Sequence, residues 1–163
     1  MSLLNIRDLS LSIAGVEILH NVSVDMQPGE IVAITGESGS GKSLTALAAM
    51  ALLPRGAVAK GQIFLDKVDI LATSELELCA IRGRKIGMVF QEPMTALNPV
   101  KTIGSQVAET ILIHERISKT EANKRAADML RRVGLEVSPL RYPHELSGGQ
   151  RQRVVIALSL IHI

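Results

Sequence analysis

The feature that most constrains the fold of this chain is the segment Gly36-Glu37-Ser38-Gly39-Ser40-Gly41-Lys42-Ser43. It fits the pattern G-x-x-x-x-G-K-[S/T], whose glycines let successive backbone N–H groups point at one anion. A β-branched run at 31–35 precedes it, and a run rich in helix formers at 44–53 follows it and ends before Pro54. This order of strand, glycine loop and helix predicts a phosphate-binding loop at the N-terminus of a helix.

The side chains of this loop suit a nucleoside triphosphate with a divalent cation. In such a loop the lysine, here Lys42, reaches the β and γ phosphates, and the hydroxyl of Ser43 coordinates Mg²⁺. We therefore predict that residues 36–43 bind the nucleotide and that Ser43 is a metal ligand. The alternative is a glycine-rich turn with an unrelated lysine, which the flanking strand and helix disfavour.

The composition is that of a globular protein of about one domain. Hydrophobic residues make up 47% of the 163 residues and charged residues 21%, which excludes extended disorder. The net charge is only +2 and aromatic residues make up 2%, so we interpret the basic residues at 82–85 and at Arg151 and Arg153 as solvated surface and expect no nucleic-acid partner. Cys79 is the only cysteine, and its apolar neighbours predict a buried, inert thiol. No apolar run approaches the roughly 20 residues of a membrane-spanning helix, so a membrane role is expected to be peripheral.

The sequence divides into a strand-rich part and a helix-rich part. Alternating and β-branched runs predict strands at 3–9, 22–26, 31–35, 62–66 and 86–90, and a short helix is expected at 74–81. After Pro99, apolar residues repeat at helical spacing in two stripes, which we interpret as the packed faces of helices. Ser118 and Glu121 form a capping box at the start of the second stripe, and Gly134 follows its end. The pattern predicts a helical subdomain after a β-rich core.

A second glycine-containing segment, Leu146-Ser147-Gly148-Gly149-Gln150, precedes an apolar helical run. A hydroxyl and two glycine N–H groups at the start of a helix predict a second anion-binding site. The segment matches the signature motif of the ATP-binding cassette (ABC) ATPases without substitution, and with the loop at 36–43 it makes the chain resemble that family. The resemblance implies that Ser147, Gly148, Gly149 and Gln150 contact the γ-phosphate of ATP held by the glycine loop of an opposing subunit, in a head-to-tail dimer of cassettes.

Gln91 follows the run at 86–90, where the family places a glutamine that touches Mg²⁺ or the attacking water and lies where a transmembrane partner docks. The resemblance therefore implies that Gln91 is a catalytic residue and a metal ligand. The continuation at 92–100 resembles the oligopeptide, dipeptide and nickel importer branch. It implies an ATPase subunit at the cytoplasmic face of the cell membrane, with the cofactors ATP and Mg²⁺, that binds permease subunits and is served indirectly by a periplasmic or extracellular solute-binding protein.

The resemblance also implies a fold class and a division into domains. We expect an α/β fold, a P-loop NTPase core of the ABC ATPase type, with an antiparallel β-subdomain and an inserted α-helical subdomain, truncated before the Walker B strand. Residues 1–91 are expected to form the nucleotide-binding core with the β-subdomain. Residues 92–153 are expected to form the helical subdomain, and 154–163 the rest of the signature helix and an artefactual tail.

The expectation of a truncated chain rests on its last residues. Residues 158–163 are what a common sequencing-transposase end encodes when read in frame. The family's catalytic carboxylates and switch histidine, and the strands that should flank 31–35, are expected beyond them. We therefore expect the isolated chain to bind nucleotide weakly, to hydrolyse none, and to expose apolar strand edges.

One departure from the family pattern concerns contact with the nucleotide base. The family stacks an aromatic ring on adenine from a loop upstream of residue 36, whereas this chain has none near residue 14. We hypothesise that Ile13 or Val16 packs on the base instead.

The alternative to an importer subunit is a soluble cassette ATPase of DNA repair or translation. The cargo and the choice between a homodimer, a heterodimer and a fused pair of cassettes stay open.

Overall fold

The computed structural model describes residues 2–90 and 96–160, and the chain divides into two compact units, Met1–Ala80 and Ile81–Ile163. Each unit buries apolar side chains of its own. Gln91 and the four residues after it lie outside the described residues. The expected division at 91/92 falls there too, so the domain boundaries stay predictions.

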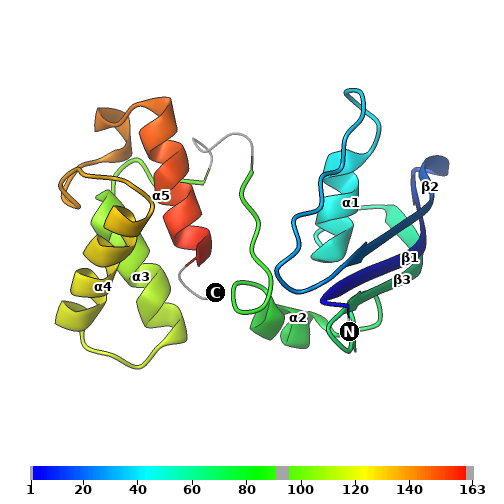
Figure 1. Cartoon of the computed structure of the whole chain (residues 1–163), viewed down its shortest axis with the longest axis horizontal. Coiled ribbons are helices and arrows are strands. Elements are labelled where there is room, and N and C mark those ends of the chain that lie inside the picture. The colour runs from blue at the N-terminus through cyan, green and yellow to red at the C-terminus, as the bar shows by residue number, and fades with distance from the viewer. Residues whose placement is uncertain (1, 91–95, 161–163) are drawn as a thin grey trace. The chain divides into compact units, whose positions relative to one another are not determined.

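The first unit is built on an antiparallel sheet with the strand order β2-β1-β3-β4 (Figure 1). Its strands are β1 (Leu4–Ile13), β2 (Val16–Met26), β3 (Ala57–Leu65) and β4 (Val68–Asp69). The strands predicted at 3–9, 22–26 and 62–66 are confirmed, and the observed strands are longer. β1 and β2 form a hairpin, since Ile13 pairs with Val16 across a two-residue turn. The turn residues Ala14 and Gly15 have the positive φ values, 50° and 80°, that such a turn requires.

A bulge interrupts this sheet at neighbouring positions of three adjacent strands. Asp8, Asn21 and Gly61 have φ values of 48°, 48° and 103°. The pairing register of β1 shifts beside Asp8 toward both of its neighbours. A Cβ on Gly61 would lie 2.5 Å from the carbonyl oxygen of Asp8. Bulges of this kind increase local twist, and here the close approach of two backbones requires glycine.

One face of the sheet forms the core of the first unit. Apolar side chains alternate with polar ones along β1 and β3, and the fully buried ones include Leu9, Leu11 and Ile63. The helix α1 (Lys42–Ala49) contacts β3, and Figure 1 shows it beside the sheet. The helix predicted to reach residue 53 ends earlier, because Met50 is its C-cap and Ala51 takes a left-handed φ of 50°.

Two of the predicted strands, 31–35 and 86–90, are not formed, so these predictions are wrong. Neither segment belongs to a ladder among the described residues, and Ile86 makes only an isolated bridge with Arg82. The side chain of Ile31 is 96% exposed. A β-branched run favours extended backbone, but a strand also needs a neighbouring strand to complete its hydrogen bonds. None of the described strands pairs with 31–35 or 86–90.

The prediction for Cys79 is also wrong. The helix α2 (Glu75–Ile81) buries Leu78 and Ile81, which lie on one face at a spacing of three residues. Cys79 is exposed, because each residue turns about 100° around a helix and the position after Leu78 leaves the buried face. Its Sγ lies 3.9 Å from Oε1 of Glu75.

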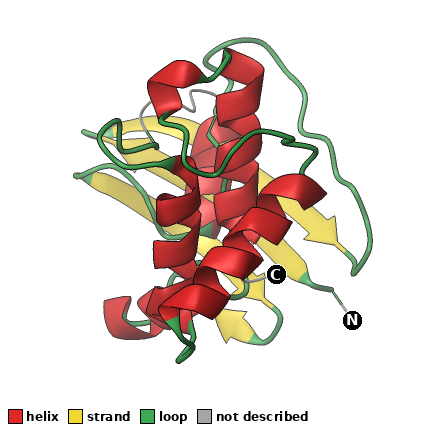
Figure 2. Cartoon of the chain, turned by 90° about the vertical axis from the view of Figure 1, so that its left-hand side faces the viewer, coloured by secondary structure: helices red, strands yellow, loops and turns green. Residues whose placement is uncertain are grey.

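The second unit is helical, as predicted. Its elements are α3 (Ile103–His114), α4 (Lys119–Arg132), the 3-10 helix η2 (Pro143–Glu145) and α5 (Gly148–Leu160). Figure 2 faces this unit and shows its helices crossing one another. Their apolar faces meet in one core, whose fully buried members include Ile103, Val107, Ala122 and Val154. None of the helices in the described ranges is long and apolar enough to cross a bilayer.

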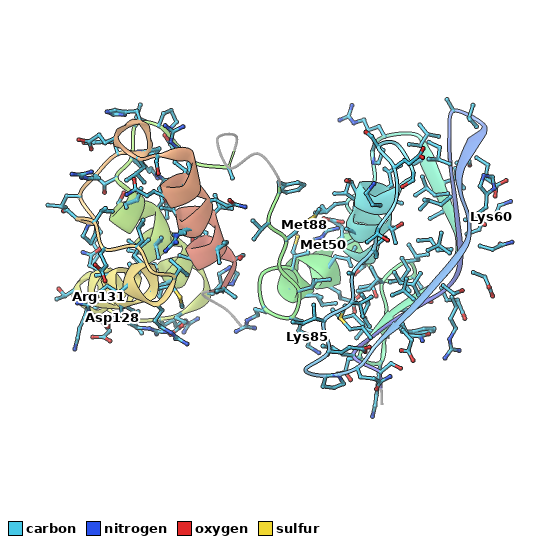
Figure 3. All side chains as sticks on the ribbon, turned by 45° about the horizontal axis from the view of Figure 1, so that its top comes forward. Met50, Lys60, Lys85, Met88, Asp128 and Arg131 are labelled. Atoms are coloured by element: carbon cyan, nitrogen blue, oxygen red, sulfur yellow. The ribbon has the colours of Figure 1, made fainter. Side chains whose placement is uncertain are left out.

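The ends of these helices follow the signals in the sequence. The hydroxyl of Ser118 accepts the N–H of Glu121 at 3.2 Å at the start of α4, and Gly134, with φ 74°, follows its end. On the exposed face of α4, Asp128 and Arg131 form an ion pair one turn apart (Figure 3). The start and the end predicted for α4 are therefore close to the observed ones.

Candidate functional site

The glycine loop at 36–43 forms a single bend that leads into α1. Gly39 and Gly41 have φ values of 84° and 87°, and Gly41 is the N-cap of the helix. The carbonyl oxygen of Gly41 accepts hydrogen bonds from the backbone N–H of Thr45 at 2.9 Å and from its hydroxyl at 3.1 Å. Thr45 is buried, so this pair fixes the first turn of the helix against the unit. Left-handed glycines followed by a helix N-terminus are the backbone of an anion site.

Lys42 closes the loop on itself. Its ammonium Nζ donates to the carbonyl oxygens of Gly36 at 2.9 Å and Glu37 at 2.5 Å, and lies 3.4 Å from Oγ of Ser40. All three acceptors are neutral, so the cation is held at the loop without a carboxylate partner among them. Lys42 is half-buried and Ser43, beside it in the first turn, is exposed. The structure thus gathers the eight predicted residues 36–43 into one loop.

The predicted base-contacting residues lie at the hairpin between β1 and β2. Ile13 and Val16 face each other across the turn, and Val16 is 66% exposed. On the same strand as Val16, Leu19 reaches the glycine loop: a Cβ on Gly41 would lie 2.2 Å from its Cδ2 atom. β2 therefore carries both the exposed valine and the side chain that packs on the loop. Contact of Ile13 or Val16 with a base stays a prediction.

The second glycine segment begins α5 and closes a reciprocal pair of hydrogen bonds. The N–H of Ser147 donates to Oε1 of Gln150 at 2.9 Å, and the N–H of Gln150 donates to Oγ of Ser147 at 3.3 Å. This arrangement is a capping box, in which two side chains satisfy two helix-end donors. This capping role was not predicted from the sequence, although the spacing S-x-x-Q carries the signal.

Gly148 and Gly149 form the first turn of this helix and face open space. A Cβ on either would meet no atom of the described residues within 4 Å, and neither has a positive φ. Beside them lies a pocket of about 430 Å³, lined by Gly134, Leu135, Glu136, Val137, Ser147, Gly149, Gln150 and Arg153. Neither packing nor backbone geometry in this chain therefore requires glycine at these two positions.

Arginines and a glutamate stiffen the chain around the second segment. Nε of Arg151 donates to the carbonyl oxygen of Leu146 at 2.9 Å, and Arg153 donates to the carbonyl oxygen of Gly134 at 2.7 Å. The interpretation of both arginines as solvated surface is incomplete, because each has a defined backbone partner. Just upstream, the N–H of Tyr142 donates to Oε2 of Glu145 at 2.7 Å. The segment that leads into α5 is thus held at several points.

The two groups of predicted site residues belong to different compact units. Residues 36–43 lie in the first unit and Ser147–Gln150 in the second. Gln91, the predicted catalytic residue and metal ligand, lies outside the described residues. The roles of all these residues stay predictions.

Comparison with known proteins finds similarity to ATP-binding proteins of transport systems. A family model described as ABC transporter matches residues 19–162. The chain is 44% identical over 167 residues to the oligopeptide transport ATP-binding protein OppD of Bacillus subtilis, and 49% identical over 166 residues to the probable D,D-dipeptide transport ATP-binding protein DdpD of Escherichia coli. These matches cover 97% and 96% of this chain but 47% and 50% of the relatives. The chain therefore spans about half the length of the curated relatives it matches.

Solved structures of the same fold also match. A dimeric post-hydrolysis state of the ATP-binding cassette MJ0796, bound to ADP and Pi, has a TM-score of 0.84 and 31% identity, over 98% of this chain and 69% of that one. The cassette cbiO1 from Clostridium perfringens, part of the transporter complex cbiONQ, has a TM-score of 0.80 and 27% identity, over 99% and 62%. These likenesses confirm the expected α/β fold of the ABC ATPase type, whereas the expected truncation stays a prediction.

Proposed function

The chain belongs to the ABC transporter family, and from this premise we propose that it is the ATP-binding part of an importer for peptides or related solutes. The observation that carries the proposal is that one chain holds a lysine-containing glycine loop at the start of α1 and the segment Ser147–Gln150 at the start of α5. The relatives OppD and DdpD, named for oligopeptide and D,D-dipeptide transport, support peptides as the class of cargo.

Residues 36–43 hold the phosphates of ATP in this proposal. Charge-assisted hydrogen bonds to phosphate are roughly twice as strong as bonds between neutral groups, so phosphate oxygens replace the loop carbonyls around Nζ of Lys42. The N-terminal end of α1 adds its favourable dipole. Ser43, exposed in the first turn, supplies the hydroxyl for Mg²⁺, which when bound neutralises charge on the β and γ phosphates. Its neutral oxygen and the open surroundings fit such a cation.

The segment Ser147–Gln150 serves the nucleotide of a second cassette. Gly148 and Gly149 leave the first turn of α5 open, so a phosphate approaching from outside can reach the N–H groups there. The neighbouring solved cassette MJ0796 is dimeric and bound to ADP and Pi, which supports such an arrangement. ATP would close the pair of cassettes, and hydrolysis, with Gln91 orienting water, would reopen it.

A permease would bind the segment that runs from Gln91 to Val100, because that segment resembles the peptide-importer form. Within its described part, Val100 is 79% exposed and is therefore accessible to such a partner. This contact would hold the chain at the cytoplasmic face of the cell membrane as a peripheral subunit. A solute-binding protein would act on it only through the permease.

Purification from detergent-solubilised membranes tests the proposal. We expect the cassette to co-purify with an identified multispanning permease, and ATP-driven peptide uptake by that complex to fall to background in Lys42→Ala while assembly is kept. Leu76→Ala, at an 85% exposed position on α2, is the control and should transport normally. Recovery with DNA or ribosomes and without any permease would instead favour the soluble alternative, which the transport proteins named above do not support.

A further inference from the structure

A buried glutamine in α3 ties down the turn that precedes this helix. Gln106 is only 8% exposed, and it is one of two buried polar or charged side chains identified among the described residues. Its Oε1 accepts the N–H of Asn98 at 2.8 Å, and its Nε2 donates to the carbonyl oxygens of Asn98 and Lys101, each at 3.0 Å. The amide therefore uses one acceptor and both donors on a single turn. A buried polar group satisfied in this way specifies one geometry, because any other leaves it unpaired.

The turn held by Gln106 carries an exposed apolar side chain. Within the turn, the N–H of Val100 donates to Oδ1 of Asn98 at 3.1 Å, and the N–H of Lys101 donates to the carbonyl oxygen of Asn98 at 3.3 Å. The ammonium of Lys101 also pairs with Oε2 of Glu109 on α3 at 2.6 Å. Leu97 is buried in the helical core, whereas Val100 projects with 79% exposure. The turn is thus held by the buried side chain of Leu97 and by the amide of Gln106, while the side chain of Val100 is exposed to solvent.

The same end of α3 is bound to the segment that leads toward Ser147. The N–H groups of Ile103 and Gly104 donate to the carbonyl oxygens of Arg141 and Pro139, each at 2.8 Å. A Cβ on Gly104 would lie 2.6 Å from Cβ of Pro139, so the two segments touch closely. The first turns of α3 therefore join the 98–101 turn on one side to the 139–141 segment on the other.

We propose that Gln106 is a positioning residue, which holds the 98–101 turn in the one geometry that the permease recognises. The inference rests on the proposed function and deepens it. A contact residue on a pre-ordered turn loses little conformational entropy on binding, so loss of the three amide bonds weakens association without any change at Val100 itself. Gln106 bonds the 98–101 turn and not the glycine loop at 36–43, which lies in the other compact unit, so we expect the contacts of that loop with nucleotide to be kept.

Three variants of the complete importer test this role. Gln106→Leu removes all three bonds at nearly constant volume. Gln106→Glu keeps an acceptor for the N–H of Asn98 but places an oxygen against the two carbonyls that Nε2 now serves. Ile111→Val, which trims a buried core residue on the same helix and leaves the bonds of Gln106 in place, is the control for general destabilisation of the helix.

The measurements are permease affinity, ATPase stimulation by the permease, nucleotide affinity, and amide hydrogen exchange. We expect both Gln106 variants to bind the permease about tenfold more weakly and to lose stimulation, with nucleotide affinity within about twofold of the wild type. Exchange of the Asn98 N–H should rise, whereas the N–H of Gly104, bonded to Pro139, should stay protected. Ile111→Val should assemble and respond normally.

Wild-type assembly by Gln106→Leu would overturn the inference and leave the proposed function standing. Equal loss in Ile111→Val would also overturn it, since the effect would then reflect general destabilisation of the helical unit. Failure of the wild type to bind any permease would refute the proposed function itself, and the inference with it.

Discussion

The side chain of Leu19 on β2 occupies the space in which a side chain on Gly41 would begin, since a Cβ at residue 41 would lie 2.2 Å from Leu19 Cδ2. Gly41 also takes a left-handed φ of 87° as the N-cap of α1. Glycine is therefore required there for two separate reasons, a close neighbour and a backbone conformation that L-residues rarely adopt. The loop is thereby fixed by β2 as well as by its own sequence.

A double-mutant cycle separates these two reasons. Gly41→Ala should destabilise the chain by about 2 kcal/mol or more, from roughly 1 kcal/mol of backbone strain plus the clash. In a Leu19→Ala background the same substitution should cost only the strain, because the clashing methyl is gone. Urea unfolding of the four proteins measures the coupling, which we expect to be about 1 kcal/mol. Strict additivity of the two substitutions would contradict the packing argument.

Substitution by alanine should cost much more stability at Gly61 than at Gly56, although both glycines lie in the first unit and both have a positive φ. Gly61→Ala should destabilise the chain by more than about 4 kcal/mol or prevent folding, because its Cβ would meet the backbone carbonyls of Asp8 and Arg7 at 2.5 and 2.6 Å. Gly56→Ala is the matched control: φ is also positive, 80°, but no atom lies within 4 Å, so the cost should be about 1 kcal/mol. Thermal unfolding of both variants compares them, and similar losses would show that the bulge tolerates a side chain.

The two glycines of α5 should behave in the opposite way. Gly148→Ala and Gly149→Ala should leave stability unchanged or raise it by about 0.5 kcal/mol, because alanine favours helix and nothing lies within 4 Å of either position. ATP-driven closure of the assembled cassettes should nevertheless be lost, since a methyl blocks the phosphate. Gly134→Ala should instead destabilise the chain, because residue 134 has a left-handed φ of 74° that alanine rarely adopts. Full activity of both α5 variants would argue against a phosphate contact.

An aromatic ring at the β1–β2 hairpin should strengthen nucleotide binding if residue 16 lies against the base. Stacking of a base on an aromatic side chain is worth about 1–3 kcal/mol, so Val16→Tyr should raise ATP affinity at least about fivefold. The wild type should bind ATP and GTP within about tenfold of each other, because aliphatic contact discriminates bases poorly. Fluorescent-nucleotide titration measures both values, with Leu76→Tyr on α2 as the control ring. Unchanged affinity in Val16→Tyr would place the base elsewhere.

The start of α2 should show a small pH dependence. The hydroxyl of Ser74, and then its backbone N–H, hold the pKa of the Glu77 carboxyl below its ordinary value of 4.5. Because the folded pKa is the lower one, the stabilisation is complete above the unfolded pKa and is lost as pH falls through the folded pKa. NMR titration should place the Glu77 midpoint below 4.5, and Ser74→Ala should raise it. An unchanged midpoint in that variant would exclude the hydroxyl as the main cause.

Local sequence signals were sufficient for much of this molecule. The pattern at 36–43 predicted a loop at a helix N-terminus, and the capping residue Ser118 and the terminating Gly134 marked α4 closely. These features depend on contacts within a few residues of one another, which a short window of sequence contains. The capping box of Ser147 and Gln150 could also have been predicted, because its spacing S-x-x-Q is visible in the sequence.

Contacts between distant residues decided the rest. The segment 31–35 has the composition of a strand but pairs with no strand in the described part of the chain, and Cys79 has apolar neighbours in sequence but lies off the buried face of α2. Likewise, only the folded chain shows that Leu19 packs on Gly41 and that Gln106 holds the turn at 98–101. By itself the sequence determined the family, the two glycine segments and most helices. Which strands pair and which polar groups become buried depends on residues brought together by the tertiary fold, because hydrogen-bond partners and packing neighbours far apart in the chain leave no periodic local signal.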